Sequence, residues 1–387
     1  MSDQRKGRKI LFASLLCASR TNALGVQMLH LAEPFGPAWA DCYWYNDGRG
    51  KSEAPTSYRL YSSIPDLWPF ATGRGFVSRM TGRLGLGWWR GNHLIARKKS
   101  HLRRLLDDIG FAFVGPLWNN DATRCREILQ TIGCPFVVHI WDFLDKPLNA
   151  DYQWLFSHAE QVFYLSPTMV QEIRATAQCE TSLLSIARGH SQFKARHCGA
   201  DMLKIGLVGT LSTYSDGVEL LSRAIDKLHS QFAEIRIKYL GAREQLAIIP
   251  ESLREFVEYA GYLYGDVRDK ALADCNVAYL PGPLLSPQED ARSRHSIPSR
   301  LADYMAIGLP VIAAVHPSSA TNAFFASIRS KGFFPASEPD DINCAVQELQ
   351  NEMFWKNASD SCLGFFGKYF DKEQAQRQLL AFAEEYV

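Results

Sequence analysis

The sequence predicts an α/β protein built from two Rossmann-like, doubly wound domains that face each other across a cleft. The chain has 387 residues, of which 47% are apolar, and this provides cores for two domains at about 100–200 residues per domain. Short apolar runs alternate with segments of helical periodicity, which is typical of parallel sheets with helices on both faces. Residues 188–202 are polar and lack any pattern, so we place the domain boundary there.

Composition and charge exclude several classes of protein. Lys and Arg number 42 and Asp and Glu number 41, a balance that argues against nucleic acid as a partner. No run of the sequence approaches the about 20 apolar residues that cross a bilayer. Nine cysteines without a C-x-x-C pair indicate a reducing compartment, so we expect a cytoplasmic protein without disulfides. His190, His197 and Cys198 lack zinc-site spacing, and we expect a linker there and no metal.

Six apolar runs in the first half predict buried strands, with helical segments between them. The first run follows basic residues, as in a signal peptide, but KILFASLL also fits a buried strand, and we interpret it as one. The predicted strands are 9–16, 38–45, 111–114, 136–140, 162–165 and 182–186. The predicted helices are 25–32, 122–131, 150–157 and 168–177.

The second half shows the clearer alternation. After a strand at 204–208, apolar residues recur at helical spacing between 220 and 228. Further strands are predicted at 235–240, 257–260, 277–280 and 311–315, with helices near 251–256 and 267–274. In such sheets ligands bind beyond the carboxyl ends of the strands. Candidate site residues are therefore Gly25, His139, Asp142, Gly209, Thr210, Arg243, Tyr262 and the segment before Leu301.

Residues 296–315, SIPSRLADYMAIGLPVIAAV, are the most informative segment. Leu301, Tyr304 and Met305 are spaced to form one apolar face of a helix. Gly308 and the proline after it predict the end of that helix, and a buried strand follows.

The start of this helix predicts an anion site. Ser296 or Ser299 can cap it, and its free N–H groups and dipole suit a diphosphate. Arg300 in the first turn opposes the helix dipole unless an anion lies there, and Asp303 could accept hydrogen bonds from ribose hydroxyls. The alternative is an ordinary capped helix with Arg and Asp on its surface.

The stretch PSRLADYMAIGLPVIA resembles the donor-binding helix of GT-B glycosyltransferases, in particular the GT4-like family, glycosyl transferases group 1. Upstream, VEYAGYL and ALADCNVAYLP are similar to the family's base-binding loop and the strand after it, and GLVGTL to the strand that opens its nucleotide domain. The resemblance spans residues 204–315. The layout is also similar to that of xanthan-type glucuronosyltransferases, which are inverting relatives.

The resemblance implies GT-B architecture: an acceptor-binding domain at 1–187, a linker at 188–202, a nucleotide-sugar-binding domain at 203–365 and a helix at 366–387 that crosses back. It implies a nucleoside-diphosphate sugar as donor substrate and no metal or other cofactor. The implied donor-binding residues are Gly25, Gly209, Thr210, Arg243, Tyr262, Ile297, Pro298, Ser299, Arg300 and Asp303.

Two positions depart from the family pattern. Asp303 matches the second acid of the E-x7-E motif, but the first acid would fall at His295. Asp216 stands about where a Lys would precede Gly217. Both retention and inversion of stereochemistry therefore remain open, and Arg243, Arg292, Arg294 or Arg300 could supply compensating charge.

The prediction of acceptor-side residues depends on the sequence FVVHIWD, which ends a predicted strand. If the enzyme inverts, Asp142 is the candidate general base for the acceptor hydroxyl. If it retains, His139 would position the transferred sugar. The alternative for His139 is a structural residue of the core.

The segment between Arg74 and Arg104 is basic and contains Trp88 and Trp89, with no acid between Asp66 and Asp107. Such a segment suits an anionic membrane surface, as expected for a transferase that acts on a saccharide or polyprenyl-linked acceptor at the inner face of the membrane. A solvated helix or a basic acceptor groove are the alternatives.

For the whole protein, a nucleotide-sugar 2-epimerase and a non-catalytic GT-B scaffold remain the alternatives to a glycosyltransferase in polysaccharide or glycolipid synthesis.

Overall fold

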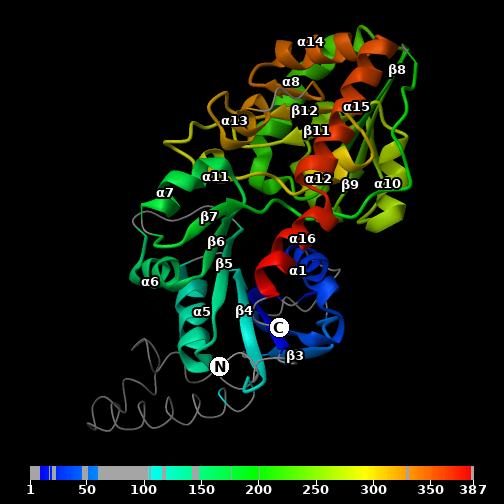
Figure 1. Cartoon of the computed structure of the whole chain (residues 1–387). Coiled ribbons are helices and arrows are strands. Elements are labelled where there is room, and N and C mark those ends of the chain that lie inside the picture. The colour runs from blue at the N-terminus through cyan, green and yellow to red at the C-terminus, as the bar shows by residue number, and fades with distance from the viewer. Residues whose placement is uncertain are drawn as a thin grey trace, which may run out of the picture.

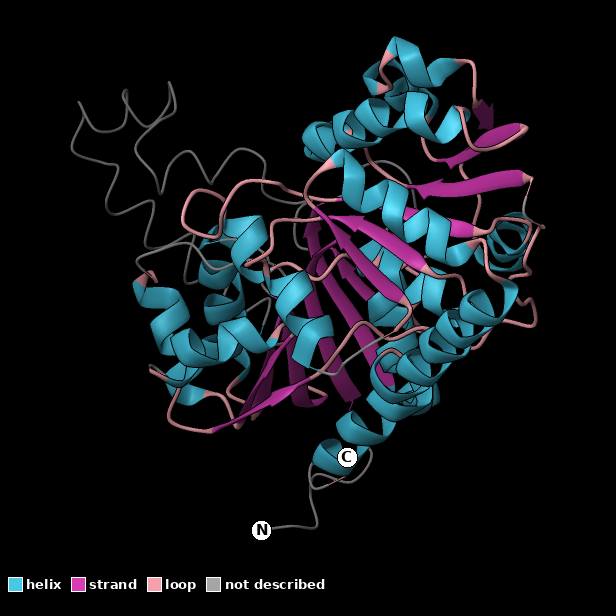
Figure 2. Ribbon diagram, turned by 90° about the horizontal axis from the view of Figure 1, so that it is seen from above, coloured by secondary structure: helices cyan, strands magenta, loops and turns pink. Residues whose placement is uncertain are grey.

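The computed structural model describes residues 9–16, 18–19, 23–45, 51–59, 103, 106–115, 119–141, 148–175, 177–199, 201–327 and 331–384. They form two sheets in two successive halves of the chain, each with helices around it (Figures 1 and 2). The α/β prediction is therefore confirmed.

The first sheet has the strand order β3-β2-β1-β4-β5-β6-β7 with every neighbouring pair parallel. Its strands are β1 (Lys9–Leu16), β2 (Trp39–Tyr45), β3 (Thr56–Arg59), β4 (Ile109–Gly115), β5 (Phe136–Ile140), β6 (Gln161–Tyr164) and β7 (Glu180–Leu183). The helices of this half are α1 (Ala23–Ala32), η1 (Glu33–Ala38), α5 (Asn119–Ile132), α6 (Ala150–His158), η2 (Pro167–Met169) and α7 (Val170–Arg174).

The second sheet has the order β10-β9-β8-β11-β12-β13 and is also parallel. Its strands are β8 (Met202–Val208), β9 (Glu234–Leu240), β10 (Val257–Tyr259), β11 (Val277–Pro281), β12 (Val311–Ala314) and β13 (Phe333–Ala336). Its helices are η3 (Ser212–Tyr214), α8 (Ser215–His229), η4 (Arg243–Ile248), α9 (Glu251–Arg254), α10 (Gly265–Ala273), α11 (Ala291–His295), α12 (Arg300–Ala306), α13 (Ala320–Ser327), α14 (Pro339–Leu349) and α15 (Glu352–Tyr369).

Both sheets are covered on their two faces, which explains their continuous apolar runs. Along β1, Leu11 and Ala13 pack into one core and Ile10 and Phe12 into another on the opposite face. Every residue of β4 and β5 is buried. Alternate side chains of β1 thus enter separate cores on the two faces of the first sheet.

The chain crosses between the halves twice. After the second sheet, α16 (Lys372–Ala383) packs against α1, and Gln376 Nε2 donates to His30 O at 2.6 Å. Leu379 joins the same core as Met28 and Leu31 of α1. Figure 1 shows α16 beside α1 although the two lie at opposite ends of the sequence.

The predicted strands in the middle of the sheets agree with the structure, and so does the edge strand β10, but the other three edge strands do not. The sequence analysis missed β3 and β13 and placed β7 two residues too late. All three are edge strands of four residues. Such strands are paired on one side only, so their apolar signal is weak.

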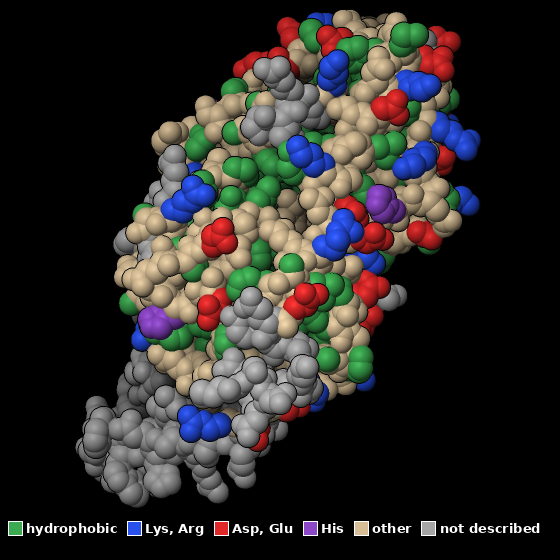
Figure 3. Space-filling view, viewed as in Figure 1, with side chains coloured by type: hydrophobic (Ala, Val, Ile, Leu, Met, Phe, Trp, Pro, Cys, Tyr) green, Lys and Arg blue, Asp and Glu red, His purple; other side chains and the backbone are tan. Residues whose placement is uncertain are grey.

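Among the described helices, none has both the length and the apolar composition that crossing a bilayer requires. On the face shown in Figure 3, acidic and basic side chains are interspersed over both halves.

Candidate functional site

The loop after β8 begins the candidate site, because the order of the second sheet reverses between β8 and β11. Gly209 has a φ of 93°, a left-handed conformation that glycine adopts without strain. Its N–H donates to Leu240 O at 2.8 Å, and its carbonyl accepts from the Tyr239 hydroxyl at 2.9 Å. Thr210 follows and is exposed. Both expected residues lie at the carboxyl end of β8.

The start of α8 lies against the exit of β11. A Cβ on Gly217 would come within 2.8 Å of Gly282 N and 2.9 Å of Gly282 O. The Tyr279 hydroxyl donates to Gly217 O at 2.6 Å. Glycine is therefore required for this approach, which brings the first turn of α8, with the exposed Asp216, to the switch point of the sheet.

Arg300 supplies positive charge at this loop. Its Nη1 donates to Val208 O at 2.9 Å, and its guanidinium carbon lies 5.0 Å from the centre of the Tyr214 ring. Arg292 lies 5.7 Å from the same ring, but its Nη2 is paired with Asp290 at 2.6 Å. No carboxylate among the described residues pairs with Arg300. Arg300 is therefore the cation available to an anion beside Gly209.

The segment before α12 does not cap that helix in the expected way. Ile297 and Pro298 are buried, whereas Ser299 is exposed. The prediction that Ser296 or Ser299 caps α12 is wrong: Ser299 has helical angles (φ −60°, ψ −28°) and makes no capping bond, and Ser296 follows the last residue of α11. A capping residue needs an extended backbone, which Ser299 lacks. Gly308, with a φ of 70°, ends α12 as predicted.

The loop after β9 is joined to the loop after β8. Gln245 Oε1 accepts hydrogen bonds from the N–H groups of Leu211 and Ser212, both at 2.9 Å. Arg243 opens the same short helix, η4, and is exposed. Arg243 thus lies on the segment that borders the candidate site.

Asp303 lies in an ion-pair cluster. Its Oδ1 accepts from Arg188 Nε and from Arg268 Nη2, both at 2.7 Å, and no described residue donates to its Oδ2. Arg188 Nη2 also contacts Asp269 Oδ1 at 2.5 Å. Burial lowers the pKa of Arg188, but the charges of Asp303 and Asp269 outweigh burial and raise it overall, so Arg188 stays charged.

Two exposed tyrosines mark the loop after β10. Tyr262 and Tyr264 are 49% and 44% exposed, and their rings meet edge to face at 4.7 Å between centroids. Gly261 and Gly265 flank them with φ values of 87° and 53°. Exposed aromatic rings on a glycine-flanked loop provide a surface on which a planar ligand can stack.

The first half holds the remaining expected residues. Gly25 is buried in the first turn of α1, not in the loop before it. Asp142 lies outside the described residues, as do Trp88, Trp89 and all of 74–104 except Arg103.

His139 is a core residue, which favours the alternative of a structural role over contact with a sugar. Its side chain is completely buried, close to the rings of Phe113 and Trp141. Nε2 donates to Leu184 O at 2.8 Å, because a carbonyl can only accept. Burial lowers the pKa of His139 to about 3, although the Leu184 bond opposes the shift. The alternating side chains of β5 direct position 139 into the sheet's covered face.

Sequence reasoning missed Arg188, Arg268 and Asp269. Arg188 fell in the segment interpreted as a polar linker, and the other two occupy an ordinary helical pattern in α10. Their pairing with Asp303 joins positions 115 residues apart in the case of Arg188, and no local pattern signals such a contact.

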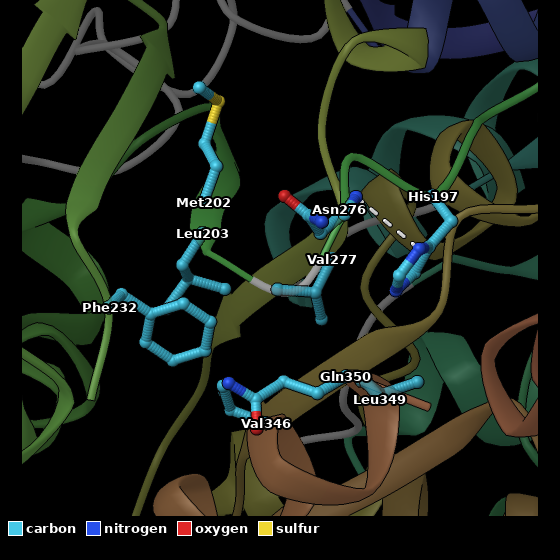
Figure 4. A pocket seen from close by; sticks show the side chains of 10 residues that line it. His197, Met202, Leu203, Phe232, Asn276, Val277, Val346, Leu349 and Gln350 are labelled. Atoms are coloured by element: carbon cyan, nitrogen blue, oxygen red, sulfur yellow. Dashed lines mark hydrogen bonds between the residues drawn. The ribbon is translucent and has the colours of Figure 1, made fainter. Parts of the chain in front are cut away.

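The pocket in Figure 4 lies at the other end of the second sheet. Met202 and Leu203 at the start of β8 and Val277 at the start of β11 line it. It is therefore distinct from the loops at the carboxyl ends of these strands. Among the described residues, no group of three or more His, Cys, Asp or Glu could hold a metal ion.

Comparisons with known proteins agree with this arrangement. Residues 203–351 match the family of glycosyl transferases group 1, and no curated protein matches the chain. HepE of Anabaena in complex with UDP and glucose is similar in structure, with a TM-score of 0.67 and 12% identity, covering 97% of this chain and 99% of its own. Sucrose-phosphate synthase of Thermosynechococcus elongatus has a TM-score of 0.66 and 14% identity, covering 98% and 99%. The chain thus has the two-domain GT-B fold, and residues 203–351 of its second half match the family of glycosyl transferases group 1.

Proposed function

We propose that this protein is a glycosyltransferase that moves a sugar from a nucleoside-diphosphate sugar to a saccharide acceptor. The match of residues 203–351 to glycosyl transferases group 1 carries the proposal. The matched region contains the loop after β8, the exposed tyrosines and Asp303, which together offer contacts for a phosphate, a base and a ribose.

Each part of the donor has a partner of suitable chemistry in this proposal. Arg300 and the backbone around Gly209 and Thr210 bind the diphosphate, since Arg300 lacks a carboxylate partner among the described residues. The free Oδ2 of Asp303 accepts from ribose hydroxyls, and the base stacks on Tyr262. Ile297, Pro298 and Ser299 hold the start of α12 in place, and Arg243 borders the site.

Transfer proceeds without a metal or another cofactor in this proposal. Fixed positive charge beside the leaving diphosphate can stabilise the charge that develops as the sugar–phosphate bond breaks. Arg300 is placed for this role. Its guanidinium is held by Val208 O and by the Tyr214 ring, so little reorganisation is needed.

For the donor, uridine nucleotides are the first choice to test. HepE of Anabaena was solved with UDP and with UDP-glucose, and a trehalose-6-phosphate protein of E. coli was solved with UDP-2-fluoro glucose. These similarities concern the fold alone. Binding measurements are therefore needed to identify the base and the sugar of this protein's donor.

For the acceptor, we propose a polyprenyl-linked or other saccharide at the cytoplasmic face of the membrane. The support is the basic, Trp-containing sequence between Arg74 and Arg104. If the reaction inverts, Asp142 is the proposed general base. Polysaccharide or glycolipid synthesis is the corresponding process.

A thermal-shift and calorimetry panel of UDP, GDP, ADP and dTDP, each with its sugar conjugates, tests the donor site. Ligand at 100 times its dissociation constant stabilises a protein by about 2.7 kcal/mol, which is a measurable shift in Tm. We expect one nucleotide family to bind and Asp303→Ala to weaken it about tenfold through loss of a charged hydrogen bond. Asp340→Ala, an exposed acid paired with Lys227, is the control and leaves affinity unchanged.

The outcomes separate the candidate functions. Binding by none of the nucleotides overturns the proposal and favours a non-catalytic scaffold. Conversion of the donor sugar in the absence of acceptor indicates an epimerase. Unchanged affinity in Asp303→Ala removes Asp303 from the ribose role while leaving the donor site in place.

A further inference from the structure

The first crossing between the two halves is anchored to both of them at successive residues. Ala187 N–H donates to Gln27 Oε1 at 2.6 Å, and Ala187 O accepts from His30 Nδ1 at 2.8 Å, both from α1 of the first half. The next side chain, Arg188, bonds to Asp269 in α10 and Asp303 in α12 of the second half. The first crossing therefore passes from one half to the other between Ala187 and Arg188.

The return crossing pairs with the same residue. Arg188 N–H donates to Phe370 O and Arg188 O accepts from Lys372 N–H, both at 2.9 Å. This parallel bridge opposite Asp371 joins the two crossings. Lys372 Nζ in turn contacts Glu33 Oε2 of the first half at 2.7 Å. We name residues 187–188 and 370–372 the hinge.

The Arg188 side chain is held on every side. It is 10% exposed, and its partners Asp269 and Asp303 are 3% and 16% exposed. Nε bonds to Asp303, Nη2 to Asp269 and Nη1 to Gly189 O at 2.6 Å. Only the planar fork of a guanidinium can make these three contacts at once.

We propose that Arg188 is a positioning residue that couples the hinge to donor binding through Asp303. The inference rests on the proposed function, in which Asp303 Oδ2 binds the ribose. Arg188 shares Oδ1 with Arg268 and contributes to fixing the orientation of the carboxylate. Movement of the halves about the hinge then shifts Asp303, and by reciprocity a donor held by Asp303 favours one angle between the halves.

Calorimetry with UDP, and with GDP in parallel, tests this coupling in the full-length protein. We expect Arg188→Ala and Arg188→Lys to weaken nucleotide affinity about tenfold, because the charged hydrogen bond from Nε to Asp303 is lost together with the fork that also holds Asp269. Asp269→Asn weakens the bond from Arg188 Nη2 and leaves Asp303 unchanged. We expect it to lower nucleotide affinity too, but by less. Arg126→Ala is the matched control. It breaks the Arg126–Asp151 ion pair of 2.9 Å between α5 and α6 in the first half and leaves affinity unchanged.

A double-mutant cycle separates positioning from simple structural support. If Arg188 acts through Asp303, Arg188→Ala has no further effect on nucleotide affinity in the Asp303→Ala background. Small-angle scattering adds a second readout: saturating nucleotide changes the radius of gyration of the wild type and not that of Arg188→Lys.

The results of these experiments distinguish failure of the proposed function from failure of the coupling through Arg188. Wild-type protein that binds neither nucleotide overturns the proposed function, and the coupling with it. Wild-type binding together with unaffected Arg188 and Asp269 variants, or with additive effects in the cycle, overturns the coupling alone. If Arg188→Ala does not fold, the Arg188→Lys and Asp269→Asn results decide.

Discussion

At the scale of single residues, burial shifts the pKa of some side chains away from the value that their amino-acid type alone predicts. Asp41 in β2 is completely buried, and its Oδ2 accepts from Ala18 N–H at 2.9 Å and from the Ser52 hydroxyl at 2.5 Å. Its Oδ1 has no partner among the described residues. Burial therefore raises the pKa of Asp41 to about 6, although both bonds oppose the shift. The carboxylate joins the segments after β1 and β2.

Asp41→Asn should change how stability depends on pH. In the folded protein the pKa is about 6, against 3.8 in the unfolded chain, so the folded state retains the proton longer. The stability from this group is fully present below pH 3.8 and is lost as pH rises to about 6. Relative to Asp41→Asn, the free energy of unfolding of the wild type should fall by about 3 kcal/mol over that range. Urea denaturation between pH 4 and 7 measures it, and parallel curves for the two proteins would contradict the prediction.

His139→Phe distinguishes a core residue from a sugar contact. The substitution leaves Leu184 O without its bond from Nε2 in a buried position. We expect it to lower the free energy of unfolding by about 1–3 kcal/mol and to leave the affinity for the donor nucleotide unchanged. Chemical denaturation and calorimetry measure the two quantities. A fall in affinity without a fall in stability would restore a direct role in binding.

Among helices and strands, close approach at glycines determines how the second half packs. Gly308 ends α12 with a φ of 70°, and a Cβ there would lie 2.7 Å from Ser359 Oγ and 3.0 Å from Leu363 Cγ, both in α15. In contrast, a Cβ on Gly364 of α15 would meet no atom within 4 Å. Glycine thus permits a close contact between α12 and α15 at position 308, whereas at position 364 it faces open space.

These two positions give a matched pair of variants. Gly308→Ala should destabilise the protein by about 2 kcal/mol or more, because alanine is strained at positive φ and also contacts α15. Gly364→Ala should stabilise it by about 0.5–1 kcal/mol through higher helix propensity. Urea denaturation of both variants provides the comparison. Equal stability of Gly308→Ala and wild type would mean that α12 and α15 separate without cost.

For the protein in its entirety, we propose that the carboxyl end of β8, the loop after β10 and the hinge act together in donor binding. Thermal stability, nucleotide affinity and the angle between the halves are linked through Arg188 in this view. The basic sequence between Arg74 and Arg104 adds a proposed membrane contact.

Vesicle sedimentation tests that contact. Full-length protein should bind vesicles that contain anionic lipid and release them as salt is raised, since each basic residue near such a surface contributes about 1 kcal/mol. Trp88→Ala combined with Trp89→Ala should weaken binding further at high salt, where apolar insertion dominates. Equal binding to neutral and anionic vesicles would contradict an electrostatic surface contact.

Much of the fold could be predicted because it depends on local periodicity. The central strands β1 and β5 coincide with their predicted bounds, since each is a continuous apolar run between turns. The sequence analysis did not predict the edge strands β3 and β13. Each has only four residues, and β13 contains Pro335. Candidate residues that directly follow strands lie where the sequence placed them, as Gly209 does after β8, and their roles in donor binding stay predictions.

The sequence by itself determined the alternation of strands and helices, the turn at Gly209, the end of α12 at Gly308 and the family resemblance of the second half, because each depends on residues near one another in the chain. Only the tertiary structure decided that His139 faces the core, that Arg300 stays without a carboxylate partner among the described residues, and that Asp303 is held by Arg188. The physical reason is that burial and ion pairing depend on contacts between distant segments. Arg188 and Asp303, 115 positions apart, meet because the chain crosses between its two halves beside α12.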